Sequence, residues 1–152
     1  MRLNTSSLSR PMLDCVFGGD DEEETMREAE KLVRRWFEEV WNQGRIEVIY
    51  ELVADDYTTR GLRDATGAPS KRDSYVAFRK QFAVEFPSVK IDVEDVVADG
   101  DRLAARCAVR VVQANTGKQA EFGGMCFMHL KNGKISQAWN NFDFASMRQQ
   151  LV

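Results

Sequence analysis

The sequence has few of the residues that bind metal ions or form disulfides. It contains one histidine, and its three cysteines, Cys15, Cys107 and Cys126, show no CxxC spacing. A structural zinc site needs about four cysteine or histidine ligands, and a disulfide framework needs paired cysteines. We therefore expect no metal site, and we expect a reduced, cytoplasmic protein.

Long hydrophobic runs and an excess of positive charge are also missing. No apolar stretch approaches the roughly 20 residues that span a bilayer, and residues 1–17 lack the apolar core of a secretory signal. The formal net charge is -3, so no basic field attracts nucleic acid or anionic lipid. We expect neither a membrane nor a nucleic acid as partner. With 152 residues, of which 43% are hydrophobic and 30% charged, the chain has the size and balance of one globular domain.

Three helices are predicted in the first part of the chain. Apolar residues recur at helical spacing from Met26 to Trp41 and charged residues fill the opposite face, with Gly44 as the stop. A short helix follows over residues 46–53, and a third runs over residues 70–86 behind a capping box.

The pattern then changes to strands. From Ser88 onward apolar and polar residues alternate, and turn signals recur at Asp99-Gly100, Thr116-Gly117 and Asn132-Gly133. Helices followed by a four-stranded meander predict an α+β fold with an antiparallel sheet. We assign residues 24–152 to a single domain and residues 1–23 to a poorly ordered N-terminal arm.

The turns determine which face of the sheet is buried. Arginines alternate with apolar residues after Gly100, so burying the apolar set requires a three-residue loop there. If the next two turns close in the same way, one concave face collects an apolar set with polar groups at one end, as in a ligand pocket. This set is Cys107, Val109, Val111, Gln113, Met125, Phe127, His129, Gln137, Trp139, Asn141 and Asp143. The Asn132-Gly133 dipeptide also fits a two-residue turn, which would turn His129 away from Asp143.

Asp143 and His129 are the candidate catalytic pair. Partly apolar surroundings beyond Trp139 would raise the pKa of the Asp143 carboxyl and suit it to general acid–base work, with His129 orienting it. Asn141 and Gln113 could donate hydrogen bonds to an oxyanion. A second interpretation stays open: Asp143 caps a C-terminal helical turn, and His129 lies on the outer face, in solvent or at a dimer contact.

Several segments together resemble the SnoaL-like polyketide cyclase family of the nuclear-transport-factor-two-like superfamily. They cover the chain from about residue 28 to its end, and they are residues 33–44, 52–57, 86–87, 93–102, 133–135 and 139–143. The resemblance implies a cone-shaped α+β barrel, commonly a homodimer, with three N-terminal helices against the curved sheet. It also implies a deep pocket for a hydrophobic small molecule and a reaction without a cofactor.

By this resemblance we expect a cyclase or isomerase that acts on a hydrophobic carbonyl compound, with Asp143 as the acid–base residue and His129 as its support. We expect the substrate to contact Trp139, Asn141, Gln113, Tyr57, Phe127, Trp41 and Phe37. The alternative is a binding module of the same fold without turnover. The chain lacks the histidine that many relatives carry after residue 57 and the longer loop that they carry after Gln113, and this favours the alternative.

Overall fold

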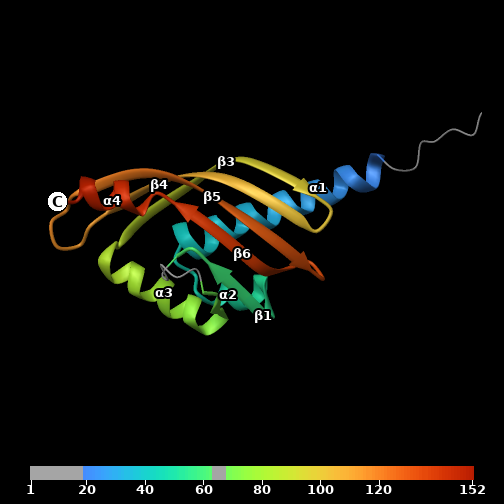
Figure 1. Ribbon diagram of the computed structural model, residues 1–152, viewed down its shortest axis with the longest axis horizontal. Coiled ribbons are helices and arrows are strands. Elements are labelled where there is room, and N and C mark those ends of the chain that lie inside the picture. Colours follow the sequence, from blue (N-terminus) through green and yellow to red (C-terminus); the bar gives the residue numbers. More distant parts are fainter. Residues whose placement is uncertain (1–18, 63–67) are drawn as a thin grey trace, which may run out of the picture.

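The computed structural model describes residues 19–62 and 68–152 (Figure 1). Its helical elements are α1 (Gly19–Arg35), the π-helix η1 (Trp36–Asn42) that continues it, α2 (Glu47–Leu52), α3 (Arg72–Glu85) and α4 (Phe144–Gln150). The strands are β1 (Val53–Arg60), β2 (Ser70–Lys71), β3 (Ser88–Asp99), β4 (Arg102–Val112), β5 (Gln119–Lys131) and β6 (Lys134–Phe142). Together they confirm the predicted α+β fold.

The strands form one curved sheet in the order β2-β1-β6-β5-β4-β3. The predicted meander is β3 to β6, whose neighbours pair antiparallel, whereas β1 joins β6 in parallel. The sheet bends around η1 and α3 as a cone and does not close (Figure 1). Within the described part of the chain, no helix is both long and apolar enough to cross a membrane.

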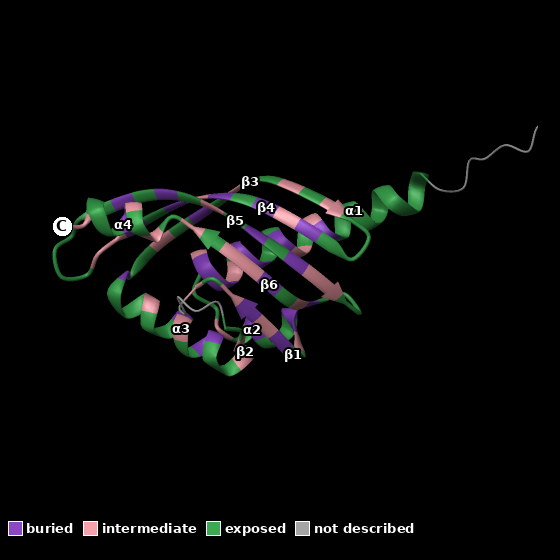
Figure 2. Ribbon diagram, in the orientation of Figure 1, coloured by how far each residue is buried: buried purple, intermediate pink, exposed green. Residues whose placement is uncertain are grey.

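Only the second half of α1 packs against the rest of the molecule. All residues from Gly19 to Glu28 are exposed and Ala29 is the first buried one, so the start of α1 projects beyond the sheet (Figure 2). The predicted stop is confirmed, because the helix ends at Asn42 and Gly44 has a φ of 70°. Of the predicted N-terminal arm, residues 19–23 belong to α1 and residues 1–18 lie outside the described residues.

The first hairpin buries the predicted residues, but its turn differs from the predicted one. Val89, Ile91 and Val93 pair with Val111, Val109 and Cys107, which confirms the predicted apolar face. The three-residue loop is wrong, because Asp99 pairs with Arg102 across a two-residue turn. A β-bulge at Glu94 inserts the extra residue that restores the alternation.

The second hairpin reverses the prediction for β5. A four-residue loop joins Gln113 to Lys118, and the Gln113 amide donates a 2.9 Å hydrogen bond to the Lys118 carbonyl across it. Odd residues of β4 therefore pair with even residues of β5, such as Cys107 with Gly124. The inner residues of β5 are Ala120, Phe122, Gly124, Cys126 and Met128, and the predicted set Met125, Phe127 and His129 faces outward.

The third hairpin keeps the predicted residues together on this outer face. Asn132 (φ 51°) and Gly133 (φ 74°) form a two-residue turn, and a bulge at Ser136 restores the pairing of odd with odd residues. Phe127 consequently pairs with Trp139, and Met125 with Asn141. The β5 and β6 residues of the predicted set do lie together, but their assignment to the concave face beside Cys107, Val109 and Val111 was wrong. Both faces of β5 and β6 carry apolar residues, so burial alone could not distinguish them.

Candidate functional site

A cavity lies between the concave face of the sheet and the helices η1 and α3. Its free volume is about 30 Å³, enough for a water molecule, so a larger ligand requires side chains of the lining to move. Its lining is mostly aromatic and aliphatic, and comprises Trp36, Phe37, Trp41, Leu62, Tyr75, Phe82, Val89, Ile91, Val109, Phe122, Asn140, Phe142 and Phe144. A wider, open hollow of about 400 Å³ lies beside it between α3 and α4 and shares Leu62, Phe82 and Phe144 with its lining.

Tyr75 supplies a hydrogen-bond donor at the cavity wall. Its hydroxyl oxygen accepts a 2.9 Å bond from the Trp41 indole N–H, and the hydroxyl proton has no acceptor among the described residues. Burial raises the pKa of Tyr75 well above its ordinary value, so the hydroxyl stays protonated at neutral pH. The bond from Trp41 polarises this hydroxyl and strengthens it as a donor.

Asn140 supplies the matching acceptor from β6. Its side-chain amide donates to the Thr59 hydroxyl and to the Arg60 carbonyl, both at 2.9 Å, which fixes the direction of the amide. Within the described chain nothing donates to its Oδ1, and Asn140 belongs to the cavity lining. Gly61 makes this arrangement possible, because its φ is 87° and a Cβ there would lie 2.0 Å from the Asn140 carbonyl oxygen.

A second close approach shapes the cavity floor. Gly124 on β5 pairs with Phe142 on β6, and a Cβ at Gly124 would lie 2.2 Å from the Phe142 ring. The ring therefore lies over the space that a side chain at Gly124 would fill, and it lines the cavity. Gly124 thus makes room for the packing of an aromatic ring.

Arg79 holds the helical wall in position. Its guanidinium donates to the carbonyls of Val40 and Trp41 at 3.0 Å and lies 4.7 Å from the centre of the Trp41 ring. These carbonyls belong to η1, whose wider turns leave backbone acceptors that a buried cation can satisfy. Burial lowers the pKa of Arg79, and its bonds fix the Trp41 indole that supports Tyr75.

The structure separates the predicted catalytic pair. Asp143 is exposed and caps α4, accepting a 3.0 Å bond from the Ser146 amide, as the second interpretation predicts. Its own amide bonds the Gly123 carbonyl, six residues along β5 from His129, or about 20 Å at 3.3 Å per residue. His129 lies on the outer face with Trp139, ring centres 4.9 Å apart. The prediction that the two side chains share the cavity is wrong, because the β4–β5 loop has one residue more than we assumed.

The predicted substrate contacts divide between the two faces. Phe37 and Trp41 line the cavity, and Tyr57 is buried beside Tyr75 with ring centres 5.8 Å apart. Gln113 lines the outer hollow. Trp139, Asn141 and Phe127 are on the outer face.

Sequence reasoning missed Tyr75 and Asn140 as site residues. Tyr75 lies in the helix predicted over residues 70–86, and its bond to Trp41 joins residues 34 positions apart, which no local pattern indicates. Asn140 was overlooked because the predicted register directed Asn141 inward in its place. In the sequence, the one indication is that Asn140 and Asn141 are adjacent in a strand, so that one of the two amides faces the core.

The buried thiols offer no alternative chemistry. Burial raises the pKa of Cys107 and of Cys126 to about 12, so both stay protonated and unreactive at neutral pH. Across residues 19–62 and 68–152, no three histidine, cysteine, aspartate or glutamate side chains converge as metal ligands.

Comparisons with known proteins agree with this fold. The solved structure of IdmH from Streptomyces antibioticus, a candidate polyketide cyclase, matches with a TM-score of 0.72 and 26% identity over 80% of this chain and 96% of that one. A candidate SnoaL-like polyketide cyclase from Jannaschia sp. CCS1 matches with a TM-score of 0.75 and 17% identity over 87% and 96% of the chains. AclR from Streptomyces galilaeus, a candidate hydroxylase, matches with a TM-score of 0.73 and 17% identity over 83% and 82%.

No curated protein matches the sequence. The family model described as SnoaL-like polyketide cyclase matches residues 31–151, which include the cavity, both of its polar groups and the whole sheet. This chain belongs to the SnoaL-like polyketide cyclase family.

Proposed function

We propose that the chain binds a hydrophobic carbonyl compound in the cavity and promotes a cyclase-type ring closure there. The observation that carries this proposal is the Tyr75 hydroxyl, supported by Trp41 and with its proton available in an apolar enclosure. A donor placed in such surroundings stabilises negative charge that develops on a carbonyl oxygen.

The lining of the cavity is better suited to positioning a substrate than to removing a proton from it. Among its described lining residues there is no aspartate, glutamate, histidine, lysine or cysteine. The acid–base role predicted for Asp143 therefore has no support from the cavity geometry. A substrate that enolises readily by itself, such as a 1,3-dicarbonyl compound, would need only folding and polarisation, which an enclosed site supplies.

Asn140 gives the proposed site a direction. A ligand carbonyl accepts from Tyr75, and an enol or hydroxyl group elsewhere on the ligand donates to Asn140 Oδ1. The aromatic lining binds the hydrophobic body between them. Because one polar group donates and the other accepts, the two together select compounds that carry both functions.

A second candidate function is binding without turnover. The absence of a base from the described lining favours it, and the relatives include a candidate hydroxylase beside candidate cyclases, so the fold does not fix the chemistry.

The first test uses the fluorescent ketone 6-propionyl-2-dimethylaminonaphthalene and its analogue without the propionyl group. We expect Tyr75→Phe to weaken binding of the ketone about tenfold, the value of one hydrogen bond of about 1.4 kcal/mol. Binding of the analogue should change little. Tyr50→Phe, at an exposed tyrosine, is the matched control. Equal binding of the ketone by wild type and Tyr75→Phe would refute the role of Tyr75.

The second test measures turnover of a 1-aryl-1,3,5-triketone by mass spectrometry, since aldol closure and dehydration remove one water. Ring closure above the buffer rate that falls in Tyr75→Phe supports the cyclase, and binding without closure supports the binding module. Asp143→Asn is expected to turn over normally. Loss of turnover in a folded Asp143→Asn variant would restore the acid–base role predicted from the sequence.

A further inference from the structure

Arg79 is a buried cation without a neighbouring anion. The residue belongs to α3 and is only 4% exposed. It donates to the carbonyls of Val40 and Trp41, and within the described part of the chain no carboxylate pairs with it. The carboxylates of η1, Glu38 and Glu39, form their hydrogen bonds and ion pairs with other residues. Carbonyl groups are dipoles without net charge, so they orient the guanidinium but do not neutralise it.

This charge lies close to a polar group of the cavity. Arg79 follows Tyr75 by four positions in α3, so both side chains lie on one face of the helix, about one turn or 5.4 Å apart. Trp41 contacts both, because its ring centre is 4.7 Å from the guanidinium and its indole N–H donates to the Tyr75 hydroxyl. Trp41 and Tyr75 line the cavity, and Arg79 is not part of the lining. The cation therefore lies behind the cavity wall.

The other ionisable groups that act on Tyr75 are neutral. They are Tyr57 of β1 and Cys126 of β5, and burial raises the pKa of both, so both stay protonated at neutral pH. Burial is also the main influence on the pKa of Tyr75 and raises it, whereas the positive charge of Arg79 acts in the opposite direction. Among the described residues, Arg79 is thus the one charged group that acts on the Tyr75 oxygen, and it favours negative charge there.

We infer that Arg79 makes the cavity select acidic ligands in their anionic form, as the phenolate of a phenol or the enolate of a 1,3-dicarbonyl compound. The O–H bond of such a ligand breaks as its proton passes to solvent water, and the ionised oxygen accepts the hydrogen bond of Tyr75. Arg79 does not touch the ligand and acts on it through its charge. The inference rests on the proposed function, because it takes the cavity as the ligand site, and it narrows the substrate class to compounds that ionise readily.

The expected effect is large enough to measure on a bound probe. An apolar lining by itself raises the pKa of a bound phenol, because burial disfavours the charged form. A cation roughly 10 Å from the phenol oxygen, at an effective dielectric constant of about 20, lowers that pKa by roughly one unit. We therefore expect the wild-type cavity to bind a phenolate at least as tightly as the neutral phenol. Removal of the charge should weaken binding of the phenolate, relative to the phenol, by roughly tenfold.

The test uses 4-nitrophenol, whose absorption distinguishes the phenol from the phenolate, and its methyl ether 4-nitroanisole, which cannot ionise. Titration of the full chain with bound 4-nitrophenol gives the pKa of the bound probe, and its displacement by 4-nitroanisole shows that both occupy one site. In wild type we expect a pKa no higher than in water. Arg79→Gln should raise it by roughly one unit, whereas Arg79→Lys, which keeps the charge, should change it little. Binding of 4-nitroanisole measures any structural effect of either substitution.

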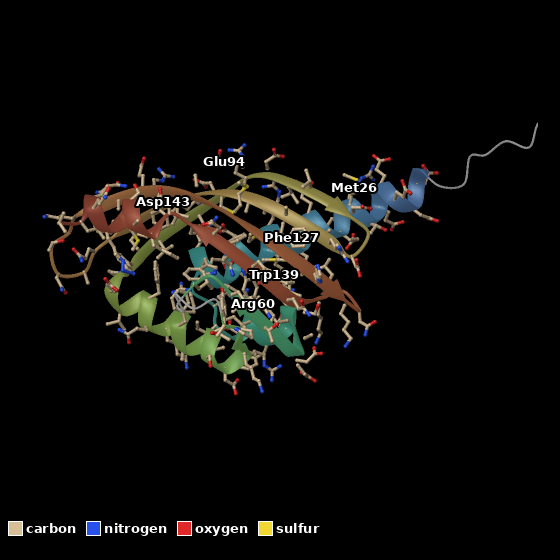
Figure 3. The ribbon with its side chains drawn as sticks, viewed as in Figure 1. Met26, Arg60, Glu94, Phe127, Trp139 and Asp143 are labelled. Carbon is tan, nitrogen blue, oxygen red and sulfur yellow. The ribbon has the colours of Figure 1, made fainter. Side chains whose placement is uncertain are left out.

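Arg60→Gln is the matched control. Arg60 also lies over a tryptophan, 5.6 Å from the Trp139 ring, but on the outer face of the sheet, where solvent screens its charge (Figure 3). Its replacement should leave the pKa of the bound probe unchanged.

Three outcomes would overturn the inference and leave the cavity as the ligand site. They are a wild-type pKa above the value in water, a pKa that Arg79→Gln leaves unchanged, and an equal rise in Arg79→Lys and Arg79→Gln. If Arg79→Gln does not fold, the wild-type pKa and Arg79→Lys decide. Failure of both probes to bind would instead refute the cavity as the ligand site, and with it the proposed function and the inference together.

Discussion

At the scale of single residues, two hydrogen-bonded side chains define the candidate site. Tyr75 and Asn140 come from a helix and from a strand, and each is fixed by one partner and keeps one hydrogen-bonding group for which the described residues offer no partner. The position of Asn140 depends further on Gly61, whose backbone approaches so closely that no side chain fits. A glycine without any side-chain chemistry therefore contributes to the geometry of the site.

Replacing Gly61 by alanine is expected to destabilise the protein more than its backbone conformation alone requires. Gly61 has a φ of 87° and an added Cβ would lie 2.0 Å from the Asn140 carbonyl oxygen, so the β1 end must move. Gly100 is the matched control, because its φ is also positive, at 58°, and nothing lies within 4 Å of an added Cβ.

We expect Gly100→Ala to lower the free energy of unfolding by about 1 kcal/mol and Gly61→Ala by about 3 kcal/mol or more. Urea unfolding measures both. Equal losses would show that the contact between Gly61 and Asn140 relaxes freely.

At the scale of elements, two bulges and one loop determine which residues reach the cavity. The bulge at Glu94 and the bulge at Ser136 each correct the alternation after a two-residue turn. The four-residue loop after Gln113 has no such correction, and it alone reverses the predicted face of β5 and β6. The side on which a strand's residues lie is thus decided by the number of residues in each turn together with any bulge in the strands that it joins.

Deletion of Glu94 is expected to be tolerated by the fold. Val93 faces inward and Asp95 outward, so joining them leaves a regular alternation. What is lost is the local bend of β3 and the ion pair of Glu94 with Arg106. We expect a loss of less than about 2 kcal/mol of unfolding free energy by urea titration.

Deletion of Asp92 is the contrasting change in the same strand. It directs either Val93 outward or Glu94 inward, so a buried apolar contact is lost or a carboxylate is buried. The chain should then lose clearly more stability than without Glu94. If the two deletions lower the free energy of unfolding equally, the bulge at Glu94 does not set the register of β3.

At the scale of the whole molecule, one curved sheet carries aromatic residues on both of its faces. Its concave face encloses the cavity with η1 and α3, and its outer face carries Phe127 and Trp139, whose ring centres are 5.9 Å apart. The strand alternation keeps the two sets of aromatic residues separate.

The sequence by itself determined the elements and their order. The helical period from Met26 to Trp41, the alternation after Ser88 and the glycine turns are local patterns, and each predicted its element. The family resemblance and the apolar pairing of β3 with β4 followed from the same patterns, because there the arginines of β4 permitted only one buried face.

Only the tertiary structure decided which face of β5 and β6 is inside. Phe122, Cys126 and Met128 on one face are as apolar as Met125, Phe127 and Trp139 on the other, so hydrophobic burial stabilises either choice. The loop after Gln113 settled it, and with it the site changed from Asp143 and His129 to Tyr75 and Asn140. A contact between residues far apart in the chain depends on register, and a local pattern that fits both faces carries no information about register.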